Sequence, residues 1–239
     1  MAWRGEKDAT RDIDLIVELR HEGEELKKAV EGAGFEVDAR RIPECARVDA
    51  SIFSGVEGMR VDVFVGTICD ELVLSQGMKS RAEFIGDYGR MSLHLCSRED
   101  IFLLKSVTER DKDLDDIVLL FRRCIDERII LEGCRAQGKL DDLLGGGIWE
   151  AFLLIKIREM ERKYEVSVPW KRQLGELALQ KLEKALVLKE IRKGASTIPG
   201  IAGRLELGRS RVGAVVSRLE EEGIVSVDRA KRPFRIAKE

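Results

Sequence analysis

What the sequence lacks excludes several classes of protein. No apolar run approaches the roughly 20 residues that a membrane-spanning helix needs. The first six residues, Met-Ala-Trp-Arg-Gly-Glu, carry charge where a secretion signal would be apolar. The sequence therefore predicts a cytoplasmic protein without a membrane partner.

Residues that bind zinc are few and scattered. The five cysteines lie at Cys45, Cys69, Cys96, Cys124 and Cys134. None of them is in a C-x-x-C spacing, and the sequence has only two histidines, His21 and His94. Structural zinc sites need four such ligands at short spacings. We therefore expect reduced, mostly buried thiols, as is usual in the cytoplasm.

The composition is that of a folded protein with an uneven charge distribution. The 239 residues are 44% hydrophobic and 36% charged, which indicates a globular chain with room for one large or two small domains. Residues 171–239 hold 16 Lys and Arg against 9 Asp and Glu, whereas the remainder holds 26 against 35. An acidic part and a basic part favour two functions rather than one.

Two apolar segments carry aspartate where a buried strand should have none. Residues 11–17 read Arg-Asp-Ile-Asp-Leu-Ile-Val, and residues 61–65 read Val-Asp-Val-Phe-Val, which predicts a half-buried strand around Asp62. Side chains at i and i+2 of a strand share one face, so Asp12 and Asp14 project together. Carboxylates beside a core need compensation, and a divalent cation supplies it.

Two interpretations of these carboxylates are open. In the first, Asp12, Asp14 and Asp62 hold Mg²⁺ or Mn²⁺, which bridges nucleotide phosphates and activates an attacking hydroxyl. In the second, Asp12 and Asp14 lie at a solvated strand end and Asp62 pairs with Arg60 or Arg11.

The same residues resemble the signature of a known protein family. Thr10-Arg11-Asp12-Ile13-Asp14-Leu15 resembles the T-x-D-I-D-L signature of the DNA polymerase β-like nucleotidyltransferase superfamily, and Arg4-Gly5-Glu6 resembles the R-G-E lead-in of its minimal members. Ser97 to Asp100, Lys105 and the run from Arg110 to Asp116 are similar to the "s-x-x-D…K…R-x-K-D-x-x-D" helices of the branch that includes AbiEii-type toxins. The resemblance covers roughly residues 1–125.

This resemblance implies a nucleotidyltransferase-like mixed sheet with helices. It further implies that Asp12, Asp14 and Asp62 are catalytic and bind metal, and that Arg11 and Lys105 contact an NTP. Lys105 has an alternative, in which its stem lies along apolar surface and its amino group reaches water. Asp113, Asp115 and Asp116 are explained by the positive end of a helix dipole.

One part of the family pattern is absent from this sequence. A G-G or G-S pair on a helix, which lets the backbone approach the phosphates, is expected at or just before Met1. The helix carrying it would cover Ile13, Leu15 and Val17, so we expect those side chains to be partly uncovered. Either the start is assigned too far downstream or nucleotide binding has been lost, and the genomic frame upstream distinguishes the two.

Between the aspartate strands and the C-terminal part, the pattern alternates between helix and strand. We predict a helix over 22–33, strands over 35–37 and 46–53 with Asp49 on a solvated face, and a turn at 55–58. Ser97 is the predicted cap of a largely buried helix that runs to about Val107. Helical pattern continues over 127–165, and the triple glycine at 145–147 is interpreted as a hinge rather than a phosphate loop.

The last seventy residues form a separate unit in the sequence. A long helix over 174–193 ends at Gly194, a short helix follows the caps Ser196 and Thr197, and a third helix runs from Ser210 to about Glu222. Strands are predicted over 224–227 and 234–237. The run over 201–225 resembles the "I-A-x-x-L-x-L-x-x-x-x-V…L-x-x-x-G-x-V" pattern of winged-helix regulators.

A winged helix places its recognition helix in the major groove of duplex DNA, while wing cations meet phosphate. The candidate DNA contacts are basic residues of the third helix and the wing: Arg209, Arg211, Arg218, Arg229, Lys231 and Arg232. The alternative is a protein-contact or dimerisation module, which leaves a homodimer open.

The sequence thus predicts an α+β protein with three parts: a nucleotidyltransferase-like domain at 1–125, a helical extension at 126–170, and a winged helix-turn-helix at 171–239. Its expected activity is Mg²⁺-dependent transfer of NMP from NTP to an unknown acceptor. The competing function is a catalytically degenerate fold within a DNA-binding transcriptional or toxin–antitoxin regulator.

Overall fold

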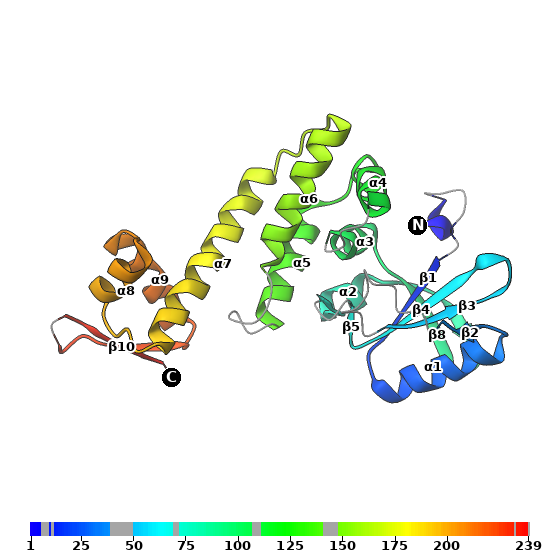
Figure 1. Ribbon diagram of the computed structural model, residues 1–239, viewed down its shortest axis with the longest axis horizontal. Helices are drawn as coiled ribbons and strands as arrows, with labels where there is room; N and C mark the ends of the chain where they lie inside the picture. The colour runs from blue at the N-terminus through cyan, green and yellow to red at the C-terminus, as the bar shows by residue number, and fades with distance from the viewer. Residues whose placement is uncertain are drawn as a thin grey trace.

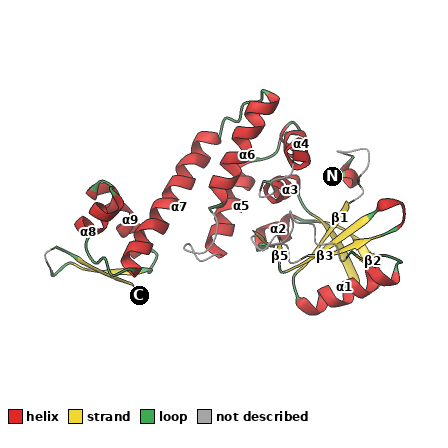
Figure 2. Cartoon of the chain, viewed as in Figure 1, coloured by secondary structure: helices red, strands yellow, loops and turns green. Residues whose placement is uncertain are grey.

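A computed structural model describes residues 1–5, 10, 12–38, 50–68, 72–106, 111–140, 148–231 and 233–238. The chain is elongated (Figure 1), with a β-sheet and helix α1 at one end and a helix–hairpin unit at the other. Helices α2 to α6 lie between them, and α7 leads from these helices into the far unit. The protein is of mixed α+β type (Figure 2). None of the helices in the described ranges has the length and apolar character needed to traverse a membrane.

The sheet that carries the aspartates has four strands in the order β1-β4-β3-β2. Their bounds are β1 Asp12–Val17, β4 Arg60–Val65, β3 Ala50–Ser54 and β2 Glu36–Val37. β1 runs parallel to β4, whereas β3 is antiparallel to both β4 and β2. The mixed sheet predicted from the sequence is therefore present.

The remaining elements of this part are short helices, two hairpins and a helical stack. The bounds are η1 Ala2–Arg4, α1 Arg20–Gly32, η3 Val56–Gly58, β5 Thr67–Ile68, β6 Leu72–Val73, α2 Gln76–Arg81, β7 Glu83–Tyr88, β8 Met91–Leu95, α3 Arg98–Lys105, α4 Asp111–Phe121, α5 Glu127–Leu140 and α6 Trp149–Tyr164. α1 begins two residues before its predicted start because the Glu22 carboxylate accepts a hydrogen bond from the Leu19 amide at 3.0 Å.

The two faces of the sheet belong to different apolar clusters. Val61 and Val63 pack with Phe53 of β3 and Val30 of α1 on one face. Phe64 projects to the other face, into a larger core formed by the helices. β4 is therefore buried on both faces, and the prediction of a half-buried strand was wrong, because helices cover the sheet on each side.

The β1 side chains on the α1 face are covered incompletely. Ile13 is 39% exposed, and Leu15 and Val17 are half-buried, although Leu15 packs against the α1 cluster. This agrees with the expectation that these three residues are partly uncovered.

The helical core extends from β4 to the start of α7. Fully buried side chains of α3, α4, α5 and α6 meet there, including Phe102, Ile117, Ile130 and Trp149. Leu174 of α7 joins the same core. The predicted helical extension at 126–170 thus packs directly on the helices that precede it, and the triple glycine at 145–147 lies outside the described residues.

The far end is built from α7 Lys171–Arg192, α8 Ile198–Leu205, α9 Arg209–Glu221, β9 Val225–Asp228 and β10 Arg235–Lys238. We call the second half of α7 with α8, α9 and the β9–β10 hairpin the C-terminal unit. The predicted apolar stripe of α9 is buried, and it packs on Val187, Leu188 and Ile191 of α7. Gly194 and Gly223 adopt φ values of +89° and +69° at the ends of α7 and α9, as the helix-stop prediction requires.

One predicted helix cap was wrong. Thr197 caps α8, and its hydroxyl accepts from the Gly200 amide at 3.3 Å, as expected. α9, however, begins at Arg209 with Gly208 as its N-cap, so Ser210 is inside the first turn. Gly208, with an extended backbone of φ −62° and ψ 139°, is therefore the N-cap two residues before the predicted serine.

Candidate functional site

The parallel pairing of β1 and β4 aligns the three aspartates. Asp14 is the direct neighbour of Asp62, and Asp12 is the neighbour of Arg60. Positions two apart share a face, so Asp12, Asp14, Arg60 and Asp62 all lie on the side of the sheet that faces the helical core. The next pair on that face, Ile16 and Phe64, packs against this core.

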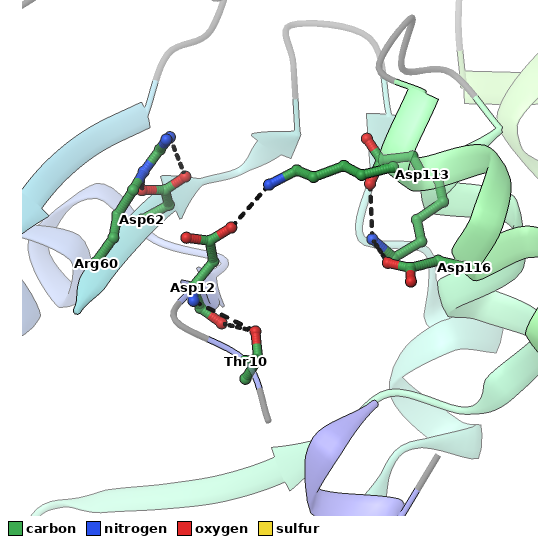
Figure 3. Close-up of polar contacts among 8 residues, drawn as sticks. Thr10, Asp12, Arg60, Asp62, Asp113 and Asp116 are labelled. Atoms are coloured by element: carbon green, nitrogen blue, oxygen red, sulfur yellow. Dashed lines mark hydrogen bonds and ion pairs between the residues drawn. The ribbon is translucent and has the colours of Figure 1, made fainter. Parts of the chain in front are cut away.

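Cations already contact two of these carboxylates. The Arg60 guanidinium donates through Nε and Nη2 to both oxygens of Asp62, each at 2.6 Å, and Asp62 is only 7% exposed. Lys112 reaches across from α4 to the Asp12 carboxylate at 2.9 Å (Figure 3). The pairing of Asp62 with Arg60 was one of the two alternatives from the sequence; Arg11 lies outside the described residues.

The chemistry of the trio suits a hard divalent cation, since Mg²⁺ and Mn²⁺ prefer carboxylate oxygens. Neighbouring strands lie about 4.8 Å apart, which lets Asp14 and Asp62 share an ion. Within the described ranges, however, no three Asp, Glu, His or Cys side chains are gathered as a metal site. The residues fit in type and backbone position, but a metal has to displace Arg60 and Lys112 from the carboxylates.

Lys105 is held in a second network behind this face. Its Nζ lies 2.8 Å from Asp113 and 2.8 Å from Asp116, two α4 carboxylates that are almost fully buried. Burial disfavours the charged form of Lys105, but its hydrogen bonds to the two aspartates outweigh that effect and raise its pKa above 10.5. The ion pairs therefore tie the end of α3 to the start of α4.

Sequence reasoning missed this network, because it explained the α4 aspartates by the helix dipole alone. A signal was available: Asp113 and Asp116 are three residues apart, and each directly precedes a buried apolar residue, Leu114 or Ile117. Acidic residues at such positions require a buried counter-charge.

A similar pair joins α2 to α3. Arg81 donates to both Asp100 oxygens, at 3.2 and 2.6 Å, and these hydrogen bonds raise the Arg81 pKa. The second block of the family-like pattern thus forms ion pairs that position α3 and α4.

The N-terminal lead-in is attached at another point. Arg4 donates to the Cys96 carbonyl at 3.0 Å and pairs with Glu83 at 3.0 Å. It therefore fastens η1 to the β7–β8 hairpin. Glu6 of the same pattern lies outside the described residues.

The candidate DNA contacts of the C-terminal unit divide into two groups. Arg209 and Arg218 of α9 are exposed, and their side chains have no partner among the described residues. The others are engaged: Arg211 pairs with Glu183 of α7, Arg229 with Glu220 of α9, and Lys231 with Asp228 at 3.3 Å. Arg232 lies outside the described residues.

Comparisons with protein-family models, with curated proteins and with solved structures found no match for this chain. Function is therefore inferred from residue chemistry and geometry.

Proposed function

We propose that the first part of the chain is a metal-dependent nucleotidyltransferase, which transfers NMP from an NTP to an acceptor of unknown identity. The β1–β4 register carries this proposal, since it supports a shared site by setting Asp14 opposite Asp62 with Asp12 on the same face. A divalent ion bound there supplies charge neutralisation at the phosphates and activation of the attacking hydroxyl.

The chain's own residues have distinct tasks in this proposal. Asp12, Asp14 and Asp62 hold the ion, with Asp14 and Asp62 as the central pair. Arg60 pairs with the nearly buried Asp62 carboxylate and fixes its orientation when no ion is bound. Lys112 does the same for the more exposed Asp12. Both cations reduce repulsion among the three carboxylates, which otherwise opposes folding.

Two measurements test the proposal. Calorimetry with Mn²⁺ should detect binding to the parent protein that is lost in Asp14→Asn and in Asp62→Asn. Incubation with Mg²⁺ and each α-labelled NTP should move label onto protein or added RNA, and the same two variants should abolish that transfer. Parent-like metal binding by either variant would contradict a shared site.

A second candidate function has its own support. Arg60 and Lys112 neutralise two of the three carboxylates, Asp62 and Asp12, without metal. A degenerate fold serving a DNA-binding regulator, transcriptional or of toxin–antitoxin type, is consistent with that arrangement. Absence of both metal binding and transfer by the parent protein would favour it.

We further propose that the C-terminal unit is a winged helix that binds duplex DNA. The observation behind this is a helix–turn–helix followed by an antiparallel hairpin, with Arg209 and Arg218 exposed on α9 and without a partner in the part of the chain that the structure describes. Affinity for a random duplex should fall steeply between about 50 and about 200 mM salt, because phosphate neutralisation releases counterions. A full-length protein that shifts no duplex at low salt would favour the protein-contact alternative.

A further inference from the structure

One face of α4 lines an open cavity beside the aspartate strands. The cavity measures about 410 Å³, within the range typical of small-molecule sites. Five lining residues come from α4, one directly follows α4, and one is the last residue of α6: Lys112, Asp115, Asp116, Val118, Leu119, Arg122 and Tyr164. Lys112, Asp115, Leu119 and Arg122 follow one another at helical spacing, so they form a single stripe along the helix.

The charges of this stripe favour an anionic ligand. Asp115 accepts from the Tyr164 hydroxyl and pairs with Lys163 at 3.6 Å, while Asp116 is paired with Lys105. Both acidic residues therefore already have partners. The Arg122 guanidinium has none among the described residues.

The cavity lining has an apolar part and a basic part. Val118, Leu119 and the Tyr164 ring are its apolar groups. Lys112 and Arg122 are its basic side chains, and the ten residue steps between them correspond to about 15 Å of helix. A ligand that matches this shape is elongated, with an anionic end and a flat apolar end.

The anionic end of such a ligand would meet the aspartate face. Lys112, which lines the cavity, contacts Asp12 on the strand opposite α4 through its amino group, at 2.9 Å (Figure 3). We propose that this cavity binds the nucleoside triphosphate, with Lys112 on the phosphates and the base over Val118, Leu119 and Tyr164. This inference rests on the proposed nucleotidyltransferase function and assigns its substrate-binding residues.

An exchange of partners follows from this assignment. Without a bound divalent ion, the Lys112 amino group is paired with the Asp12 carboxylate at 2.9 Å. If Asp12 held a divalent ion, Lys112 would be released from the carboxylate and could contact the phosphates of the nucleotide. Metal and nucleotide binding should therefore reinforce each other through this one side chain.

The test is calorimetry on the full chain, with each of the four NTPs and with inorganic tripolyphosphate as a probe that lacks the base. Lys112→Ala should weaken both kinds of ligand by about ten- to a hundred-fold, the usual effect of losing a charge-assisted hydrogen bond. Leu119→Asp should weaken NTP binding and leave tripolyphosphate binding unchanged. Arg123→Ala is the matched control, because Arg123 is an exposed neighbour of Arg122 that does not line the cavity.

A variant of the partner carboxylate sharpens the experiment. In EDTA, Asp12→Asn should strengthen tripolyphosphate binding about two- to five-fold, because Lys112 loses an exposed ion pair that competes with the ligand. If Lys112→Ala behaves like Arg123→Ala, or if the parent binds no NTP, the inference is overturned.

The outcomes separate this inference from the proposed function. Metal binding and transfer that persist in Lys112→Ala and Leu119→Asp overturn the cavity assignment and leave the enzyme proposal standing. A different outcome is NTP binding in EDTA that depends on Lys112, without any NMP transfer. That outcome supports the cavity assignment and counts against catalysis.

Discussion

Replacing Lys105 with methionine should destabilise the protein strongly, although the substitution keeps the length and apolar stem of the side chain. The lysine amino group forms ion pairs with Asp113, whose side chain is 0% exposed, and with Asp116, whose side chain is 6% exposed. Removing one partner of a buried ion pair leaves an uncompensated charge, which costs about 3–5 kcal/mol. That loss is a large share of the free energy of unfolding of a typical domain, which is roughly 5–15 kcal/mol.

The assay is urea unfolding followed by circular dichroism, with the free energy of unfolding compared at an unchanged m-value. Lys112→Met is the matched control, because its ion pair with Asp12 is largely solvent-exposed and should contribute at most about 1 kcal/mol. Combining Lys105→Met with Asp113→Asn and Asp116→Asn should recover part of the loss, since the buried charges are then removed together.

The pH dependence has a definite sign. A lysine whose pKa is raised in the folded state stabilises the fold fully below its unfolded pKa, and that contribution is lost as the pH rises through the folded value. For Lys105 the loss should therefore begin above about pH 10.5 and be missing in Lys105→Met. A loss of less than about 1 kcal/mol in Lys105→Met would refute the buried network. Such a small loss would instead favour the interpretation from the sequence in which Lys105 contacts the phosphates of the NTP.

Three further predictions concern other parts of the molecule. Arg60→Gln should raise Mn²⁺ affinity by roughly tenfold in calorimetry, because the Asp62 oxygens lose a competing bidentate partner; an unchanged affinity would mean that Asp62 does not bind the ion. Arg218→Ala should reduce the salt slope of duplex binding by about one, measured by fluorescence anisotropy, and an unchanged slope would remove Arg218 from the DNA surface. Brief alkylation followed by mass spectrometry should label the exposed Cys124 and spare Cys134, since burial and then the nearby Glu150 raise the Cys134 pKa well above its usual range. Faster labelling of Cys134 would contradict the packing of α5.

Elements with strong apolar periodicity could be predicted from the sequence. The α9 stripe is one case, because Val212, Val215, Val216 and Leu219 repeat at helical spacing and are all buried. Helix ends marked by glycine could be predicted equally well, since only glycine readily adopts the positive φ found at Gly194.

The β7–β8 hairpin could not be predicted in the same way. Most of its side chains are exposed or half-buried, and Phe84, Tyr88 and Met91 are among the exposed apolar residues. Without a buried face, a strand has no alternation of apolar and polar residues to detect. A register shift between Phe84 and Gly86 weakens the pattern further.

The candidate site was predictable in its backbone positions but not in its partners. The D-x-D spacing and the alternation around Asp62 placed three carboxylates on one face. The contact between Lys112 and Asp12 joins residues 100 positions apart, so it depends on how α4 packs against the sheet. The same holds for Arg211 of α9, whose partner Glu183 belongs to α7.

Helix α7 decides how the two proposed activities are related in space. Its first half contributes Leu174 to the helical core, and its second half contributes Val187 and Ile191 to the core of the C-terminal unit. The buried Glu150 of α6 pairs with Lys181 at 2.7 Å, midway along α7. The 22 residues of this helix span about 33 Å without a break. A continuous helix packed at both ends differs from a flexible tether, whose ends move independently. DNA bound by α9 would therefore lie at a set distance and orientation from the aspartate face. An acceptor bound to the same DNA would have to approach that face from one fixed direction.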